Sequence, residues 1–100
     1  MYMYIKNVTG SSKISYKPKN GAKSWLNFWE MNTNNYLQDD VLYICPGCGR
    51  NVYKSQLDGC HVQKNDFRDQ SWYIVPLCDS CNHRADVIDI GNLTMVSVNP

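Results

Sequence analysis

The chain has 100 residues, which is enough for one small domain but too few for a second hydrophobic core or a deeply enclosed active site. Hydrophobic residues make up 43% of the chain and charged residues 19%, which excludes a disordered chain, a collagen-like repeat and a coiled coil. Its longest apolar run is far shorter than the roughly 18 residues of a membrane span. Lys6 and Asn7 interrupt the apolar start of the chain too early for a secretory signal. We therefore expect an intracellular protein with no membrane partner.

The charges are distributed unevenly along the chain, although the net charge is only +1. Residues 1–29 contain five lysines and no acidic residue, whereas residues 30–44 contain three acidic residues and no basic one. A surface that binds DNA would have to use the basic amino-terminal segment, unless those lysines only solvate a short arm. Five further basic residues are candidate phosphate contacts or simply solvated side chains: Arg50, Lys54, Lys64, Arg68 and Arg84.

The amino-terminal residues predict a short strand. Residues 2–5 are aromatic or β-branched, which is typical of a strand. Turn-forming residues follow at 9–12, and a second break in regular structure follows at 17–21. We therefore expect the next regular element to begin after residue 21.

Residues 24–31 predict a short amphipathic helix. Their spacing places Trp25, Phe28 and Trp29 on one helical face, and the asparagine-rich residues 32–35 end the helix. We interpret this aromatic face as core packing, with the stacking of a ligand as the alternative.

The middle of the chain predicts three strands. Residues 41–44 form an apolar strand that leads into the first cysteine pair. Residues 52–57 and 60–63 flank Asp58 and Gly59, a dipeptide that is typical of a tight hairpin turn. We therefore expect a hairpin centred on these two residues.

Three residues mark the boundaries of the elements beyond this hairpin. Pro76 places the end of a strand at an edge or a bend, Asp79 is a candidate helix N-cap, and Gly91 is a candidate helix stop. The expected elements are a polar loop at 64–71, a strand at 72–77, a helix at 80–88 and a strand at 93–98.

Four of the five cysteines form two pairs with the same spacing. Residues 45–48 have the sequence Cys-Pro-Gly-Cys and residues 78–81 have the sequence Cys-Asp-Ser-Cys, so each pair offers two thiolates from one tight turn. One metal ion bound to both pairs would close a loop of 29 intervening residues. The spacing therefore predicts a tetrahedral metal site formed by Cys45, Cys48, Cys78 and Cys81.

We interpret this site as structural zinc, because four thiolates leave no open coordination position for chemistry. A redox dithiol and an iron–sulfur cluster are the alternatives that the same residues allow. Because a domain of this size is marginally stable, we expect the metal-free chain to be unfolded or molten. The fifth cysteine, Cys60, is interpreted as a small buried apolar residue, with a redox or alternate-ligand position as the alternative.

The order of these elements predicts the fold class. A knuckle with one ligand pair, a hairpin, and a helix that carries the second pair are the layout of a treble-clef zinc finger. We therefore predict a small α+β fold, a zinc-stapled treble clef with a ββα-metal-like hairpin and helix over residues 41–100. Residues 1–40 are expected to form an amino-terminal extension with a strand and the short helix.

Residues 58–62, Asp-Gly-Cys-His-Val, and residues 73–82, Tyr-Ile-Val-Pro-Leu-Cys-Asp-Ser-Cys-Asn, resemble the HNH (His-Me finger) nuclease module. The resemblance covers residues 45–88 and is strongest to the zinc-bearing branch that includes recombination endonuclease VII. It implies that His61 is a general base that activates water and that Asn82 helps to bind a catalytic divalent cation, Mg²⁺ or Mn²⁺.

Two positions depart from the pattern of this family. Cys60 occupies the position where the family has an acidic residue or a histidine that anchors the metal, and Tyr73 occupies the position of its middle asparagine. Asp58 and His83 are the residues that could complete the catalytic metal site in their place. Over nearly its whole length the chain also resembles small HNH-like proteins of bacteria and phages, through the Ser-Trp-Leu segment at 24–26 and the motifs above.

The sequence therefore leaves two functional hypotheses. The first is a metal-dependent DNA endonuclease or nickase in which His61 and Asn82 act with Asp58 or His83. The second is a catalytically inert zinc module that binds nucleic acid or a protein partner, for example as a phage-encoded modulator of a host system.

Overall fold

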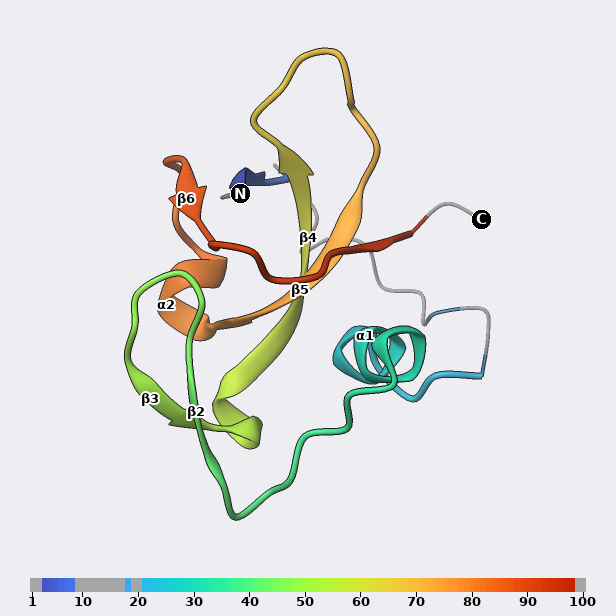
Figure 1. Cartoon of the computed structure of the whole chain (residues 1–100), viewed down its shortest axis with the longest axis vertical. Coiled ribbons are helices and arrows are strands. Elements are labelled where there is room, and N and C mark those ends of the chain that lie inside the picture. The colour runs from blue at the N-terminus through green and yellow to red at the C-terminus, as the bar shows by residue number, and fades with distance from the viewer. Residues whose placement is uncertain (1–2, 9–17, 19–20, 99–100) are drawn as a thin grey trace.

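The computed structural model describes residues 3–8, 18 and 21–98, which form a five-stranded sheet, a two-stranded ribbon and short helices (Figure 1). This confirms the predicted α+β class. The expected turn at 9–12 and most of the expected break at 17–21 lie outside the described residues. No helix within residues 3–8 and 21–98 is long and apolar enough to cross a membrane.

The main sheet is antiparallel and has the strand order β6-β1-β4-β5-β7. β1 lies between β4 and β6, so the amino-terminal strand shares one sheet with the residues that follow the ribbon. This strand begins two residues later than the sequence predicts. The strands are β1 (Tyr4–Asn7), β4 (Leu57–Lys64), β5 (Tyr73–Cys78), β6 (Ile88–Asp89) and β7 (Val96–Ser97).

Helix α1 (Trp25–Thr33) confirms the predicted amphipathic helix. The Ser24 hydroxyl caps its first turn by accepting a hydrogen bond from the Asn27 backbone N–H at 3.0 Å. Asn34 ends the helix in a left-handed conformation with φ 55°. Phe28 and Trp29 are buried against the β4–β5 hairpin, so the aromatic face packs in the core as expected.

The predicted turn at Asp58 and Gly59 is wrong, because β4 runs straight through both residues. Gly59 lies opposite Pro76 of β5, and the hairpin turns instead through residues 65–72. A Cβ atom on Gly59 would collide with the α1 backbone at Leu26 and Trp25. Glycine is therefore required here by the close approach of a helix rather than by a turn.

Gly59→Ala should destabilise the protein by about 2–3 kcal/mol, because the added methyl group would push the backbone of α1 away from the sheet. Chemical denaturation of the metal-loaded protein measures this change in the free energy of unfolding. A change below about 0.5 kcal/mol would contradict the close helix–sheet packing described here.

The ribbon of β2 (Leu42–Ile44) and β3 (Asn51–Tyr53) is separate from the main sheet. β2 confirms the predicted strand at 41–44. β3 is shorter than the predicted strand at 52–57, because the chain enters the 3-10 helix η2 (Lys54–Gln56) before β4 begins. The ribbon and η2 together carry the chain from the first cysteine pair to the central hairpin.

Helix α2 (Asp79–Asn82) is one turn long, so the helix predicted at 80–88 is wrong in its length, and Gly91 does not end it. Its N-cap is Cys78, one residue before the predicted cap at Asp79. The Asn7 side-chain amide donates to the carbonyls of Cys81 and Arg84, both at 2.9 Å. These bonds occupy backbone acceptors that a longer helix would use.

The chain after α2 forms short edge strands. β6 pairs with β1 and fully buries Ile88. β7 covers only two residues of the predicted strand at 93–98 and pairs with β5 at Tyr73 and Ile74. The part of β5 around Pro76 therefore has no neighbouring strand on the side away from β4. This agrees with the chemistry of proline, which has no N–H to donate to a neighbouring strand.

The central hairpin has two faces with different neighbours, because side chains alternate along a strand. Gly59, His61 and Ile74 face α1. Cys60 and Val75, which are paired across the hairpin, belong to the core cluster that contains the cysteine pairs. Figure 1 shows α1 on one side of β4 and β5 and α2 on the other.

Candidate metal centre

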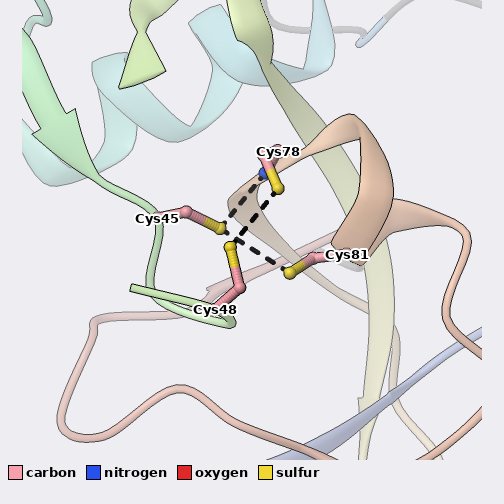
Figure 2. A group of neighbouring side chains, drawn as sticks. All are labelled: Cys45, Cys48, Cys78 and Cys81. Carbon is pink, nitrogen blue, oxygen red and sulfur yellow. Dashed lines mark hydrogen bonds between the residues drawn. The ribbon is translucent and has the colours of Figure 1, made fainter. Parts of the chain in front are cut away.

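The four paired cysteines converge at one point between the ribbon and α2 (Figure 2). All four sulfur atoms lie within 4.8 Å of one another. The Cys45–Cys81 sulfur distance is 3.8 Å and the Cys48–Cys78 distance is 3.7 Å. Four sulfurs placed 2.3 Å from one ion at tetrahedral corners lie about 3.8 Å apart. The cluster therefore has the dimensions of a tetrahedral thiolate site that could hold a metal ion.

The first pair is held by a tight turn between β2 and β3. The Gly49 N–H donates to the Cys45 carbonyl at 2.9 Å, and Gly49 has a φ of 78°, which favours glycine. Gly47 packs against the second pair, since a Cβ atom there would lie 2.9 Å from the Cys81 sulfur. The sequence Cys-Pro-Gly-Cys-Gly thus allows both the turn and the close approach of α2.

The second pair spans the junction of β5 and α2. Cys78 is the last residue of β5, and Cys81 lies in α2 three residues later. The Cys78 backbone N–H donates to the Cys45 sulfur at 3.4 Å, which links the two pairs directly. Cys48 is exposed whereas the other three are buried, so the cluster lies just beneath the surface.

Arg50 supplies positive charge beside the cluster. Its guanidinium donates to the Cys78 sulfur and to the Ser80 hydroxyl, both at 3.4 Å. Burial raises the pKa of Cys78, but hydrogen bonds from Arg50 and the Cys81 backbone outweigh this effect and bring the pKa down to about 6. Arg50 therefore favours the thiolate form that binds metal.

Cys81 shows why the cluster needs a cation. Burial and the neighbouring sulfurs of Cys45 and Cys48 raise the pKa of Cys81 to about 12. Four thiolates at these distances repel one another unless a positive ion lies between them. The cluster is therefore suited to a divalent cation, and the five cysteines are free thiols rather than disulfides.

Cys60 lies outside this group. It is buried in the core, and its sulfur donates to the Asp58 carbonyl at 3.4 Å. Burial raises the pKa of Cys60 well above its ordinary value, so the side chain is a neutral thiol. These features agree with the interpretation of Cys60 as a small buried apolar residue.

His61, the candidate general base, is buried on the α1 face of the hairpin. Its ring packs edge-on against Trp25 at 4.6 Å and against Trp72 at 5.8 Å between centroids. Its Nε2 atom has no hydrogen-bond partner among the described residues. Burial lowers the pKa of His61, so the imidazole is neutral near pH 7.

The other three candidate residues lie together on the opposite face, near α2. Asn82 ends α2 and His83 follows it, and α2 packs against β4, which carries Asp58. Burial and the Asp79 carboxylate raise the pKa of Asp58, while a hydrogen bond from Asn82 and the charge of His83 lower it in part. The His83 ring is exposed, and its Nδ1 lies 2.8 Å from the Asp79 carbonyl. The structure thus brings Asp58, Asn82 and His83 together but places His61 on the other side of the strand.

Most candidate phosphate contacts are already neutralised by neighbouring carboxylates. The exception is Arg50, which contacts the cysteine cluster instead. The ion pairs are Lys54–Glu30 at 3.2 Å, Lys64–Asp69 at 3.2 Å, Arg68–Asp66 at 3.1 Å and Arg84–Asp86 at 2.6 Å. These side chains therefore form no free basic surface in the described part of the chain, and Lys13, Lys17 and Lys19 lie outside it.

Among the residues that the structure describes, the cysteine cluster is the group whose ligand atoms lie close enough to hold a metal ion. Comparison with known protein families, curated proteins and solved structures finds no match for this chain. The resemblance to the HNH module stays a prediction.

The sequence analysis did not predict the contact between Arg50 and Cys78. Arg50 follows Cys48 by only two residues, and this proximity could have indicated a basic side chain beside the cysteine cluster.

The buried position of His61 predicts a pH dependence of stability. The unfolded chain binds a proton below about pH 6.5 more readily than the folded protein does, because burial lowers the folded pKa. The stabilising contribution of neutral His61 should therefore be present above pH 6.5 and be lost as the pH falls.

His61→Phe removes this proton-binding site and keeps an aromatic ring against Trp25. The wild-type protein should lose stability relative to His61→Phe between pH 7.5 and 5.5, by at most about 1.4 kcal/mol per pH unit. Denaturation of both metal-loaded proteins across this range measures the difference, in which the common metal contribution cancels. Parallel stability curves would contradict the buried neutral histidine.

Proposed function

We propose that this chain is a treble-clef zinc module whose metal is structural and whose function is binding rather than catalysis. The four converging sulfurs support the proposal, since a closed set of four thiolates matches structural zinc and leaves no position for a substrate. The order of the elements supports it as well. A knuckle between β2 and β3, the β4–β5 hairpin and a short α2 with the second pair follow one another in the chain.

Zinc is the metal that best fits this donor set. Thiolate ligands select zinc, copper(I) and iron–sulfur clusters, and zinc prefers the tetrahedral arrangement found here. When bound, zinc would neutralise the repulsion among the four sulfurs. In zinc-finger peptides the corresponding free energy is on the order of 10–16 kcal/mol, which is comparable to the total stability of a small domain.

Cys81→Ala should abolish stoichiometric metal binding and the folded structure, because it removes one of four ligands. Cys60→Ala is the matched control, since it removes a buried thiol that lies outside the cluster. The control should bind one zinc ion per chain and give the thiolate-to-cobalt charge-transfer band when loaded with cobalt. Metal content, the cobalt spectrum and circular dichroism measure these outcomes. Equal metal binding by both variants would contradict the proposed site.

A binding module should not cleave DNA. Two observations support this part of the proposal: His61 is packed between aromatic rings on the face opposite Asn82, and most described cations are paired with carboxylates. A general base must reach the water that it activates, and a polyanion needs free positive charge.

We therefore expect supercoiled plasmid to remain intact when incubated with the zinc-loaded protein in Mg²⁺ or Mn²⁺, as it does in EDTA. His61→Ala and Asp58→Asn serve as parallel samples. Metal-dependent nicking that disappears in both variants would overturn the proposal and establish the nuclease that the HNH resemblance implies. Nicking that persists in both would indicate a contaminant, which repurification removes before the result is scored.

A further inference from the structure

The outer face of the β2–β3 ribbon carries large apolar side chains that are exposed. Leu42 is 53% exposed, Ile44 69% and Tyr53 45%. Leu42 and Tyr53 are cross-strand partners, and Ile44 lies two residues along β2 on the same face. We call these three residues the ribbon patch. Contiguous exposed apolar side chains of this kind mark interaction surfaces in small soluble domains.

The backbone of β2 also has unused hydrogen-bonding groups beside this patch. The Cys45 N–H donates to the Arg50 carbonyl at 2.8 Å, so these two residues form a hydrogen-bonded pair of the ribbon. Such pairs alternate along antiparallel strands, so Tyr43 forms the next one. The N–H and C=O groups of Leu42 and Ile44 therefore point away from β3, and among the described residues no hydrogen bond engages them.

The edge of β3 differs from that of β2. The outward N–H of Tyr53 donates to the side-chain carbonyl of Gln56 at 2.9 Å. This bond occupies the β3 edge at the point where the ribbon meets η2. The β2 edge is thus the side of the ribbon on which another strand can pair.

The charges next to β2 indicate which strand fits. Asp39 and Asp40 lie in the turn before β2, separated from it by Val41; both are exposed and have no ion-pair partner among the described residues. Residues 30–44 contain no basic residue that could neutralise them. A strand with positive charge at the end nearest to these carboxylates would complement them.

A second copy of this chain fits this edge less well. In two-fold pairing of β2 with its own copy, Leu42 lies opposite Ile44, which places Asp40 opposite Pro46 of the other copy. Pro46 lies between two cysteines of the cluster, and residues 39–49 contain no lysine or arginine that could face these carboxylates. The carboxylates of one copy would therefore meet no complementary charge on the paired strand of the other.

We infer that β2 is the docking edge for an extended, basic and apolar segment of a protein partner, which adds to the ribbon as a third, antiparallel strand. The inference rests on the proposed binding function and names the class of partner. The partner's backbone would form hydrogen bonds with Leu42 and Ile44, and its alternate apolar side chains would pack against the ribbon patch. Its lysine or arginine side chains would form ion pairs with Asp39 and Asp40.

The test uses a blocked eight-residue peptide of alternating valine and threonine with two lysines at its carboxyl end. Antiparallel pairing places that end beside Asp39 and Asp40. Titrated into the ¹⁵N-labelled, zinc-loaded full chain, it should shift the amide signals of residues 39–44 with a Kd of roughly 0.1–1 mM. The same peptide N-methylated on alternate residues, and the peptide with glutamate in place of lysine, should each bind at least tenfold more weakly.

Two variants of the chain locate the site. Ile44→Thr keeps a strand-forming residue but removes the apolar contact, and should weaken binding at least threefold. Val87→Thr is the matched control, since Val87 is 40% exposed and lies outside the ribbon, and should bind like the wild type. Both substitutions are at the surface, so the dispersion of the amide spectrum should be unchanged.

Several results would overturn the inference: no shifts at 2 mM peptide, equal binding of the N-methylated peptide, or shifts that lie outside the ribbon. Concentration-dependent shifts of residues 39–44 without peptide would assign the edge to a second copy, and shifts there with a DNA oligonucleotide would assign it to nucleic acid. Failure of the proposed zinc module is distinguishable, because a chain without the metal site would lack a dispersed spectrum before any peptide is added.

Discussion

The convergence of four cysteine sulfurs is the constraint on which the rest of the structure depends. One pair comes from the ribbon and the other from the junction of β5 and α2. Cys48 of the first pair and Cys78 of the second are 30 residues apart in the sequence. Unscreened thiolates at these distances would push the two segments apart, whereas one divalent ion would hold them together. The strands of the ribbon and of β6 and β7 have only two or three residues each, so an ion bound by the four cysteines would link elements that pack weakly by themselves.

The alternation of side chains along β4 separates two environments that are adjacent in the sequence. Cys60 packs on the side of the cysteine cluster, and His61 faces the aromatic side chains around α1. The residues of the HNH-like motif are therefore separated: His61 lies on the α1 face of β4, whereas Asp58 lies on the other face, near Asn82 of α2. The physical consequence is that His61 serves the packing of α1, while Asp58 and Asn82 belong to the surface around α2.

Features that depend on local spacing could be predicted from the sequence, and features that depend on distant contacts could not. The CxxC pairs and α1 could be predicted because a tight turn and a helical period can both be recognised within a short stretch of consecutive residues. Gly59 was misread as a turn because the helix that requires it lies more than 30 residues earlier. The length of α2 depends on Asn7, which is 74 residues from Cys81. The apolar β2 gave no sign in the sequence that its outer face is exposed.

Hydrogen exchange of the backbone amides, with and without stoichiometric zinc, tests the central claim most directly. The account predicts that zinc protects amides in β4 and β5 as well as those around the cysteines, because the metal holds the whole sheet together. It also predicts that removal of zinc by a chelator abolishes this protection throughout the sheet. Protection of β4 and β5 that persists unchanged in the metal-free chain would contradict the claim that the fold depends on the four-cysteine site.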